Sequence, residues 1–202
     1  MKYNPGEISK ENDLDLVPWE RGVRQGGFMD INNMSKNLID FNNTMNKFKV
    51  PFVLIFGGLL GLVRENNFIK YDTDIDVACF NEFVRRDHWK MKDIKDDLIN
   101  KGFKVVGNDE CYLHIDFFIR NGEKIEIWWF DKIDEEWIFG ETVRYPSCYF
   151  DKLEEKSFLG TIFKVPSNPE KFIELTYGKS WKTPNPKAKW ISLNPKDVGK
   201  RI

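Results

Sequence analysis

The chain has 202 residues, with 31 Lys and Arg against 32 Asp and Glu and a formal net charge of −1. This length suits one domain with a real core, because a chain of this size buries about 70% of the surface that its unfolded form exposes. The balanced charge argues against a surface for nucleic-acid polymers. No stretch approaches the ~20 consecutive apolar residues of a membrane span, and the first residues lack the apolar segment of a signal peptide.

Three cysteines, Cys79, Cys111 and Cys148, are far apart in the sequence and odd in number. This pattern favours reduced, buried thiols over a disulfide framework or a cysteine-based zinc site. We therefore expect a cytoplasmic protein.

The first half of the chain predicts an arm, a helix and a strand. Residues 1–30 are polar with scattered Pro and Gly, and we expect an extended arm in which Trp19, Val23 and Phe28 contact the domain. Residues 31–48 carry apolar side chains at steps of three and four, which predicts a helix with one buried face. The apolar run 52–56 then predicts a strand.

The strand stops at Gly57 and Gly58, which predicts a tight turn with an uncovered backbone. The apolar residues 59–63 suit a short buried helix after that turn. A glycine-rich turn that opens a helix presents backbone N–H groups and a positive dipole end, and both favour phosphate.

Asp74 and Asp76 follow, two positions apart, with Ile75 and Val77 at the alternate positions. On a strand the two carboxylates share one face, where they repel each other unless a cation lies between them. Mg²⁺ prefers such oxygen ligands. A phosphate-binding turn followed by a carboxylate pair is the layout of a metal-assisted phosphoryl or nucleotidyl transferase, although each half alone also suits an ordinary turn and a solvated strand end.

Residues 82–101 predict a surface helix, and 103–106 a short strand. The runs 113–120 and 123–130, joined by Asn121 and Gly122, predict a β-hairpin with a type I′ turn. In that register Phe117 faces Glu126 and Asp116 faces Ile127, so Asp116 and Glu126 point to opposite faces. An Asp in so apolar a strand is costly to bury unpaired, which favours a cation partner or hydrogen bonds to the backbone.

The last part of the chain predicts a polar connection over 131–150 and two short strands within 150–165. Ser167, Asn168 and Pro169 predict the start of a helix that stops at Gly178. Residues 179–202 are rich in Lys and suit either a solvated tail or a lid over an anionic substrate.

These motifs resemble the LicD/fukutin family of the nucleotidyltransferase-fold superfamily over most of residues 50–186. The family pattern is close to G-T-L-L-G-x-x-R, then G-F-I-P-W, then D-D-D-I-D. This chain has Gly57-Gly-Leu-Leu-Gly-Leu-Val-Arg64, then Phe68-Ile69, then Asp72-Thr-Asp-Ile-Asp76. The resemblance implies an α/β protein of the α+β type, with a mixed β-sheet and helices packed against it. We expect an arm over 1–30, a catalytic domain over 31–186 and a Lys-rich tail over 187–202.

The family transfers a phospho-alcohol group, such as phosphocholine or a polyol phosphate, from a CDP-linked donor. The acceptor is a hydroxyl of a glycan or a small molecule. The resemblance implies that Asp74, Asp76 and Asp116 are catalytic and hold Mg²⁺ or Mn²⁺. Asp116 is chosen over Glu126 because family members have a His-x-Asp strand at this distance. The predicted substrate-binding residues are Gly57, Gly58, Arg64, Tyr71, His114, Tyr177 and Trp181.

Two departures from the family pattern affect these expectations. Gly58 replaces a hydroxyl residue, which removes one side-chain contact to phosphate, and Thr73 replaces the middle acid of the Asp triplet. Two other functions stay open. One is transfer of a nucleoside monophosphate from an NTP to a small molecule, and the other is a degenerate nucleotide-binding module.

Overall fold

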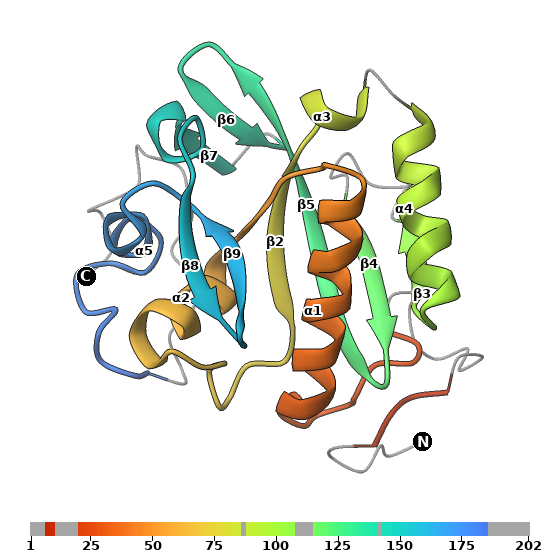
Figure 1. Ribbon diagram of the computed structural model, residues 1–202. Helices are drawn as coiled ribbons and strands as arrows, with labels where there is room; N and C mark the ends of the chain where they lie inside the picture. The colour runs from red at the N-terminus through yellow and green to blue at the C-terminus, as the bar shows by residue number, and fades with distance from the viewer. Residues whose placement is uncertain (1–6, 11–19, 86–87, 108–114, 141–142, 186–202) are drawn as a thin grey trace.

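A computed structural model describes residues 7–10, 20–85, 88–107, 115–140 and 143–185. Figure 1 shows helices on a central sheet. The helices are α1 (Ile31–Lys47), α2 (Phe56–Glu65), α3 (Glu82–Arg85), α4 (His88–Asn100) and α5 (Pro169–Tyr177), with a 3₁₀ turn at Ser147–Tyr149. The strands are β1 (Phe52–Leu54), β2 (Ile75–Phe80), β3 (Lys104–Gly107), β4 (Ile115–Arg120), β5 (Glu123–Ile133), β6 (Glu136–Phe139), β7 (Val143–Pro146), β8 (Glu154–Phe158) and β9 (Thr161–Val165).

The main sheet has the strand order β1-β2-β5-β4-β3, and β6 and β7 extend it from the far end of β5. Only the β2–β5 pair is parallel among the described strands, and β8 and β9 form a separate antiparallel pair. This mixed sheet with helices packed against it confirms the predicted fold class.

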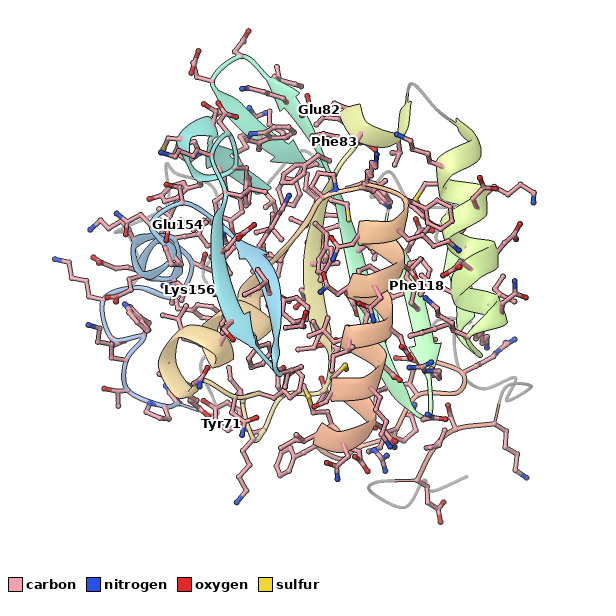
Figure 2. All side chains as sticks on the ribbon, viewed as in Figure 1. Tyr71, Glu82, Phe83, Phe118, Glu154 and Lys156 are labelled. Atoms are coloured by element: carbon pink, nitrogen blue, oxygen red, sulfur yellow. The ribbon has the colours of Figure 1, made fainter. Side chains whose placement is uncertain are left out.

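One face of the sheet is covered by α1 and α4. Phe41 of α1 packs edge-to-face on Phe118 of β4, with ring centroids 5.6 Å apart, and Figure 2 shows Phe118 beside α1. Lys95 of α4 contacts Asp116 on the same side of β4. Side chains at alternate positions of β2 and β5 project from the opposite face, where a pocket lies beside α2.

The predicted hairpin is confirmed residue by residue. Asn121 and Gly122 have φ angles of 54° and 83°, as a type I′ turn requires. In the observed register Arg120 pairs with Glu123, Phe117 with Glu126 and Asp116 with Ile127. The prediction that Asp116 and Glu126 lie on opposite faces is therefore correct.

The helix over 31–48 is confirmed as α1, and the side chain of Asp30 caps it by accepting hydrogen bonds from the N–H groups of Asn32 and Asn33. The helix after Pro169 is confirmed as α5 and ends at Gly178, where φ is 80°. The single helix predicted over 82–101 is instead divided into α3 and α4.

The polar connection predicted for 131–150 is wrong. β5 continues to Ile133, a turn at Asp134 with φ of 52° reverses the chain, and β6 and β7 follow. Trp137, Phe139 and Tyr145 from these strands are buried in the core. The acidic residues at the turn, Asp134 and Glu135, led to the prediction of a polar connection, although the strands that follow them carry buried apolar side chains.

Two local expectations also change. The bend between β1 and α2 falls on Phe56, with φ of 46°, so both glycines lie inside the first turn of α2. Cys79 is buried as expected, but Cys148 is exposed, and Cys111 lies outside the described residues.

Residues 20–30, expected as part of an arm, lie against the hairpin turn. Val23 forms a β-bridge with Gly122, and Arg24 makes an ion pair with Glu123. We expected Phe28 to pack against the domain, but it is 60% exposed. Trp19 lies outside the described residues. None of the helices in the described ranges is long and apolar enough to cross a lipid bilayer.

Candidate active site

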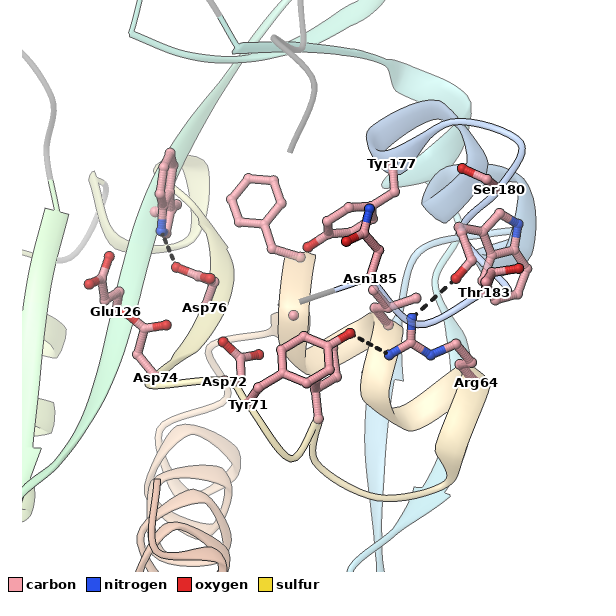
Figure 3. Close-up of a pocket in the computed structure, with 16 residues that line it drawn as sticks. Arg64, Tyr71, Asp72, Asp74, Asp76, Glu126, Tyr177, Ser180, Thr183 and Asn185 are labelled. Carbon is pink, nitrogen blue, oxygen red and sulfur yellow. Dashed lines mark hydrogen bonds between the residues drawn. The ribbon is translucent and has the colours of Figure 1, made fainter. Parts of the chain in front are cut away.

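A pocket of about 410 Å³ lies on the face of the sheet opposite α1 and α4. Its floor comes from the beginnings of β2 and β5, and its other walls come from α2, the end of α5 and the segment 180–185 (Figure 3). This volume falls within the range of small-molecule sites.

Three carboxylates line the sheet side of this pocket. Asp74 precedes β2, Asp76 lies within it, and Glu126 is the residue of β5 that pairs directly with Asp76. The indole N–H of Trp128 donates a hydrogen bond of 2.9 Å to Asp76 Oδ1. The parallel pairing of β2 with β5 thus brings the Asp pair beside a third acid.

The close carboxylates shift one another's protonation. Burial raises the pKa of Asp76 well above its usual range, and the charges of Asp74 and Glu126 add to that rise. Burial also raises the pKa of Glu126, although the neighbouring Lys124 ammonium opposes the shift. Such a group of acids favours a bound cation.

Lys124 supplies a positive charge at the edge of this group. Its Nζ lies 3.3 Å from Asp74 Oδ2 and contacts Glu126 Oε1. Burial alone would lower the pKa of Lys124, but Glu126 and Asp74 raise it by more, so the ammonium stays charged.

Asp72 and Gly57 meet where α2 begins. A Cβ on Gly57 would lie 2.0 Å from Asp72 Oδ2, so only glycine allows this approach. Burial and the charge of Asp74 raise the pKa of Asp72 to about 7, while a hydrogen bond from the Thr73 N–H opposes the shift. Asp72 therefore lines the pocket beside the Asp pair.

Arg64 is the cation on the helix side of the pocket. Its guanidinium donates hydrogen bonds to the carbonyl of Trp181 at 3.2 Å and to the hydroxyl of Tyr71 at 3.4 Å, and it pairs with Glu65 (Figure 3). These contacts tie the end of α2 to the segment after α5. Arg64 thus faces the carboxylates across the pocket.

The expectation that Asp116 joins Asp74 and Asp76 is wrong. Asp116 lies on the other face of the sheet, where it pairs with Lys95 at 2.7 Å and accepts a hydrogen bond of 2.8 Å from the Trp129 indole. The carboxylate of Asp116 thus has a lysine and an indole as its polar partners, in place of a metal ion. Glu126 belongs to the same hairpin, and its side chain projects from the opposite face of the sheet. It lies beside Asp74 and Asp76, where Asp116 was predicted.

The other predicted residues divide into three sets. Gly58 faces Ile75 and Leu54 instead of the pocket, and His114 lies outside the described residues. The pocket brings together Gly57, Arg64, Tyr71, Asp74, Asp76, Tyr177 and Trp181. Sequence reasoning missed Asp72, Glu126, Trp128, Ser180, Thr183 and Asn185 as lining residues.

Oxygen ligands of the kind that Mg²⁺ prefers are present in Asp74, Asp76 and Glu126. Among the described residues, however, no three His, Cys, Asp or Glu side chains are already arranged to hold a metal ion. The chemistry of the donor set fits a divalent cation, and the Lys124 ammonium lies between two of those donors.

Comparison with known proteins places the chain in a family. Residues 49–168 match the family described as LicD/FKTN/FKRP, nucleotidyltransferase domain. The human ribitol-5-phosphate transferase FKTN is 29% identical over 165 residues, which cover 75% of this chain and 34% of that protein. The human ribitol 5-phosphate transferase FKRP is 26% identical over 149 residues, covering 64% and 28%. The chain spans about a third of the length of these relatives.

Among solved structures, the antibiotic-resistance factor ANT(2'')-Ia superposes with a TM-score of 0.51. Its sequence is 16% identical, and the match covers 80% of this chain and 78% of that one. This similarity supports the fold alone. The family match spans more than half of the residues, and the chain therefore belongs to the LicD/FKTN/FKRP family of nucleotidyltransferase domains.

Proposed function

We propose that this chain transfers a phospho-alcohol group from a CDP-linked donor to a hydroxyl of a glycan. The observation that carries the proposal is the pocket in which Asp74, Asp76 and Glu126 face Arg64. Family membership and the ribitol-5-phosphate transferase relatives support ribitol 5-phosphate as the first group to test.

In the proposed reaction, the oxygen of the acceptor hydroxyl attacks the phosphorus that carries the alcohol. The bond from that phosphorus to the CMP oxygen breaks, and CMP leaves. Glu126 accepts the proton of the attacking hydroxyl at its carboxylate.

Asp74, Asp76 and Glu126 would also hold Mg²⁺ or Mn²⁺. When bound, such an ion neutralises the charge that develops on the phosphate oxygens. Donor binding is assigned to the opposite wall. The planar guanidinium of Arg64 suits a phosphate, as does the start of α2 at Gly57. Tyr71, Tyr177 and Trp181 form the aromatic wall for the cytosine base.

The test is CMP release from CDP-ribitol, CDP-glycerol and CDP-choline, each with Mg²⁺ or Mn²⁺ and a panel of glycan acceptors. We expect CMP release that depends on the metal and is lost in Asp76→Asn. Release of pyrophosphate from an NTP mixture, without CMP release from any CDP-linked donor, would contradict the proposal and favour nucleotidyl transfer.

A further inference from the structure

The side chain of Lys124 lies among the proposed metal ligands. It precedes Glu126 by two residues on β5, so the two side chains project from the same face of the sheet. Its Nζ contacts Glu126 Oε1 and lies 3.3 Å from Asp74 Oδ2. Lys124 and Glu126 of β5 thus meet Asp74, the residue just before β2, with opposite charges in contact.

The surroundings of Lys124 hold it in this position. Its side chain is 16% exposed, and those of Asp74 and Glu126 are 24% and 13% exposed. The ammonium also lies 5.5 Å from the ring centroid of Phe117, the residue of β4 that is paired with Glu126 of β5. A surface lysine has no such enclosure and samples many rotamers.

The oxygens of Asp74 and Glu126 cannot fully coordinate a divalent ion while they surround this ammonium. The described residues contain no preformed set of three metal-ligating side chains, which agrees with carboxylates arranged around Nζ instead. Any divalent ion that binds must displace the ammonium or accept its repulsion at a few ångströms.

We propose that Lys124 is a tethered counter-ion, which holds Asp74 and Glu126 together in the metal-free chain and weakens the binding of the divalent ion. The inference rests on the metal site of the proposed function. Lys124 is here a positioning residue that sets how much free metal the site requires.

The experiment is calorimetric titration of Mn²⁺ alone, without any donor, into the wild-type chain and Lys124→Met. Free Mn²⁺ is measured in parallel by electron paramagnetic resonance. We expect K124M to bind Mn²⁺ roughly tenfold more tightly or better, because a unit charge about 5 Å from a divalent ion costs about that factor even in water. Equal or weaker binding by K124M would overturn the proposal.

Two further variants serve as controls. Lys124→Arg keeps the charge and is expected to bind Mn²⁺ within about threefold of wild type, and a gain equal to that of K124M would contradict the role of charge. Lys95→Met removes the lysine that pairs with Asp116 on the other face of the sheet. It should leave Mn²⁺ affinity unchanged.

Thermal unfolding gives a readout independent of catalysis. In EDTA, K124M should melt at a lower temperature than wild type, because its carboxylates lose their counter-ion, and saturating Mn²⁺ should raise its melting temperature by more. Absence of Mn²⁺ binding in both proteins would overturn the inference. Tighter binding by K124M without CMP release from any donor would support the inference while contradicting the proposed function.

Discussion

The two adjacent glycines at the start of α2 have different surroundings. A Cβ on Gly57 would collide with Asp72 Oδ2 at 2.0 Å, whereas a Cβ on Gly58 would lie 3.4 Å from side-chain carbons of Ile75. A side chain at position 58 would therefore point toward the core, and we expect the absence of a hydroxyl there to weaken donor binding less than the sequence suggests.

A pair of variants tests this difference. Gly57→Ala should lower the rate of CMP release by about tenfold or more, because Asp72 must move away from the donor wall. Gly58→Ser should stay within about threefold of wild type, since a Cβ at position 58 would make only ordinary van der Waals contacts with Ile75 and Leu54. Steady-state kinetics of CMP release would measure both variants. A lower KM for the donor in G58S would contradict the conclusion that position 58 faces the core.

Asp72 makes stability depend on pH. Its pKa in the folded chain is raised to about 7, chiefly by burial and then by Asp74, against about 3.9 when unfolded. The folded state thus holds the proton more tightly, so the stabilisation is complete below about pH 4 and is lost as pH rises through about 7.

We therefore expect the free energy of unfolding in EDTA to fall between pH 5 and pH 8. Asp72→Asn should remove up to about 2.5 kcal/mol of that fall, because Asn carries no titrating proton. Urea denaturation at several pH values measures it. An unchanged slope in D72N would show that other groups cause the dependence.

At the scale of elements, the strongest local signals predicted the structure well. Asn121-Gly122 determined both the turn and the register of β4 with β5, and apolar periodicity identified α1. Strands β6 and β7 were missed because they are short and because the turn that leads from β5 into β6, at Asp134, has no glycine. Their apolar residues become interpretable only when the core around Phe80 and Phe130 is known.

The segment before α1 is attached to the hairpin turn by a partly buried ion pair. Arg24 Nε and Nη2 donate hydrogen bonds of 3.1 Å and 2.9 Å to Glu123, whose side chain is fully buried. Removing the arginine would leave a buried carboxylate without this partner, which is far more costly than breaking an exposed pair.

Arg24→Ala should therefore lower the free energy of unfolding by about 3 kcal/mol. The matched control is Arg144→Ala, whose pair with Glu136 is about 40% exposed and should contribute at most about 1 kcal/mol. Urea denaturation compares the two. Similar losses in both variants would contradict a structural role for the segment 20–30.

At the scale of the whole molecule, the site separates charge across a pocket. The sheet supplies the acids, α2 supplies Arg64, and the contact from Arg64 to the Trp181 carbonyl links α2 to the segment after α5. Segments far apart in the sequence thus line one pocket, as Figure 3 shows.

The Asp pair, the glycine turn, Arg64 and the aromatic residues of this pocket could be predicted from the sequence, but the third acid could not. Alternation along the hairpin correctly separated Asp116 from Glu126, yet it does not reveal which hairpin strand pairs with β2 or which face the helices cover. The pairing of Asp76 with Glu126, and the burial of Asp116 against Lys95 and Trp129, decide both points.

The central claim is that Glu126, and not Asp116, completes the reacting centre with Asp74 and Asp76. The direct test compares the rates of CMP release in Glu126→Gln and Asp116→Asn, after thermal unfolding shows that both variants are folded. We predict that E126Q loses about 100-fold or more of the rate, whereas D116N stays within about threefold of wild type. Loss of the rate in D116N with E126Q nearly unaffected would contradict the account.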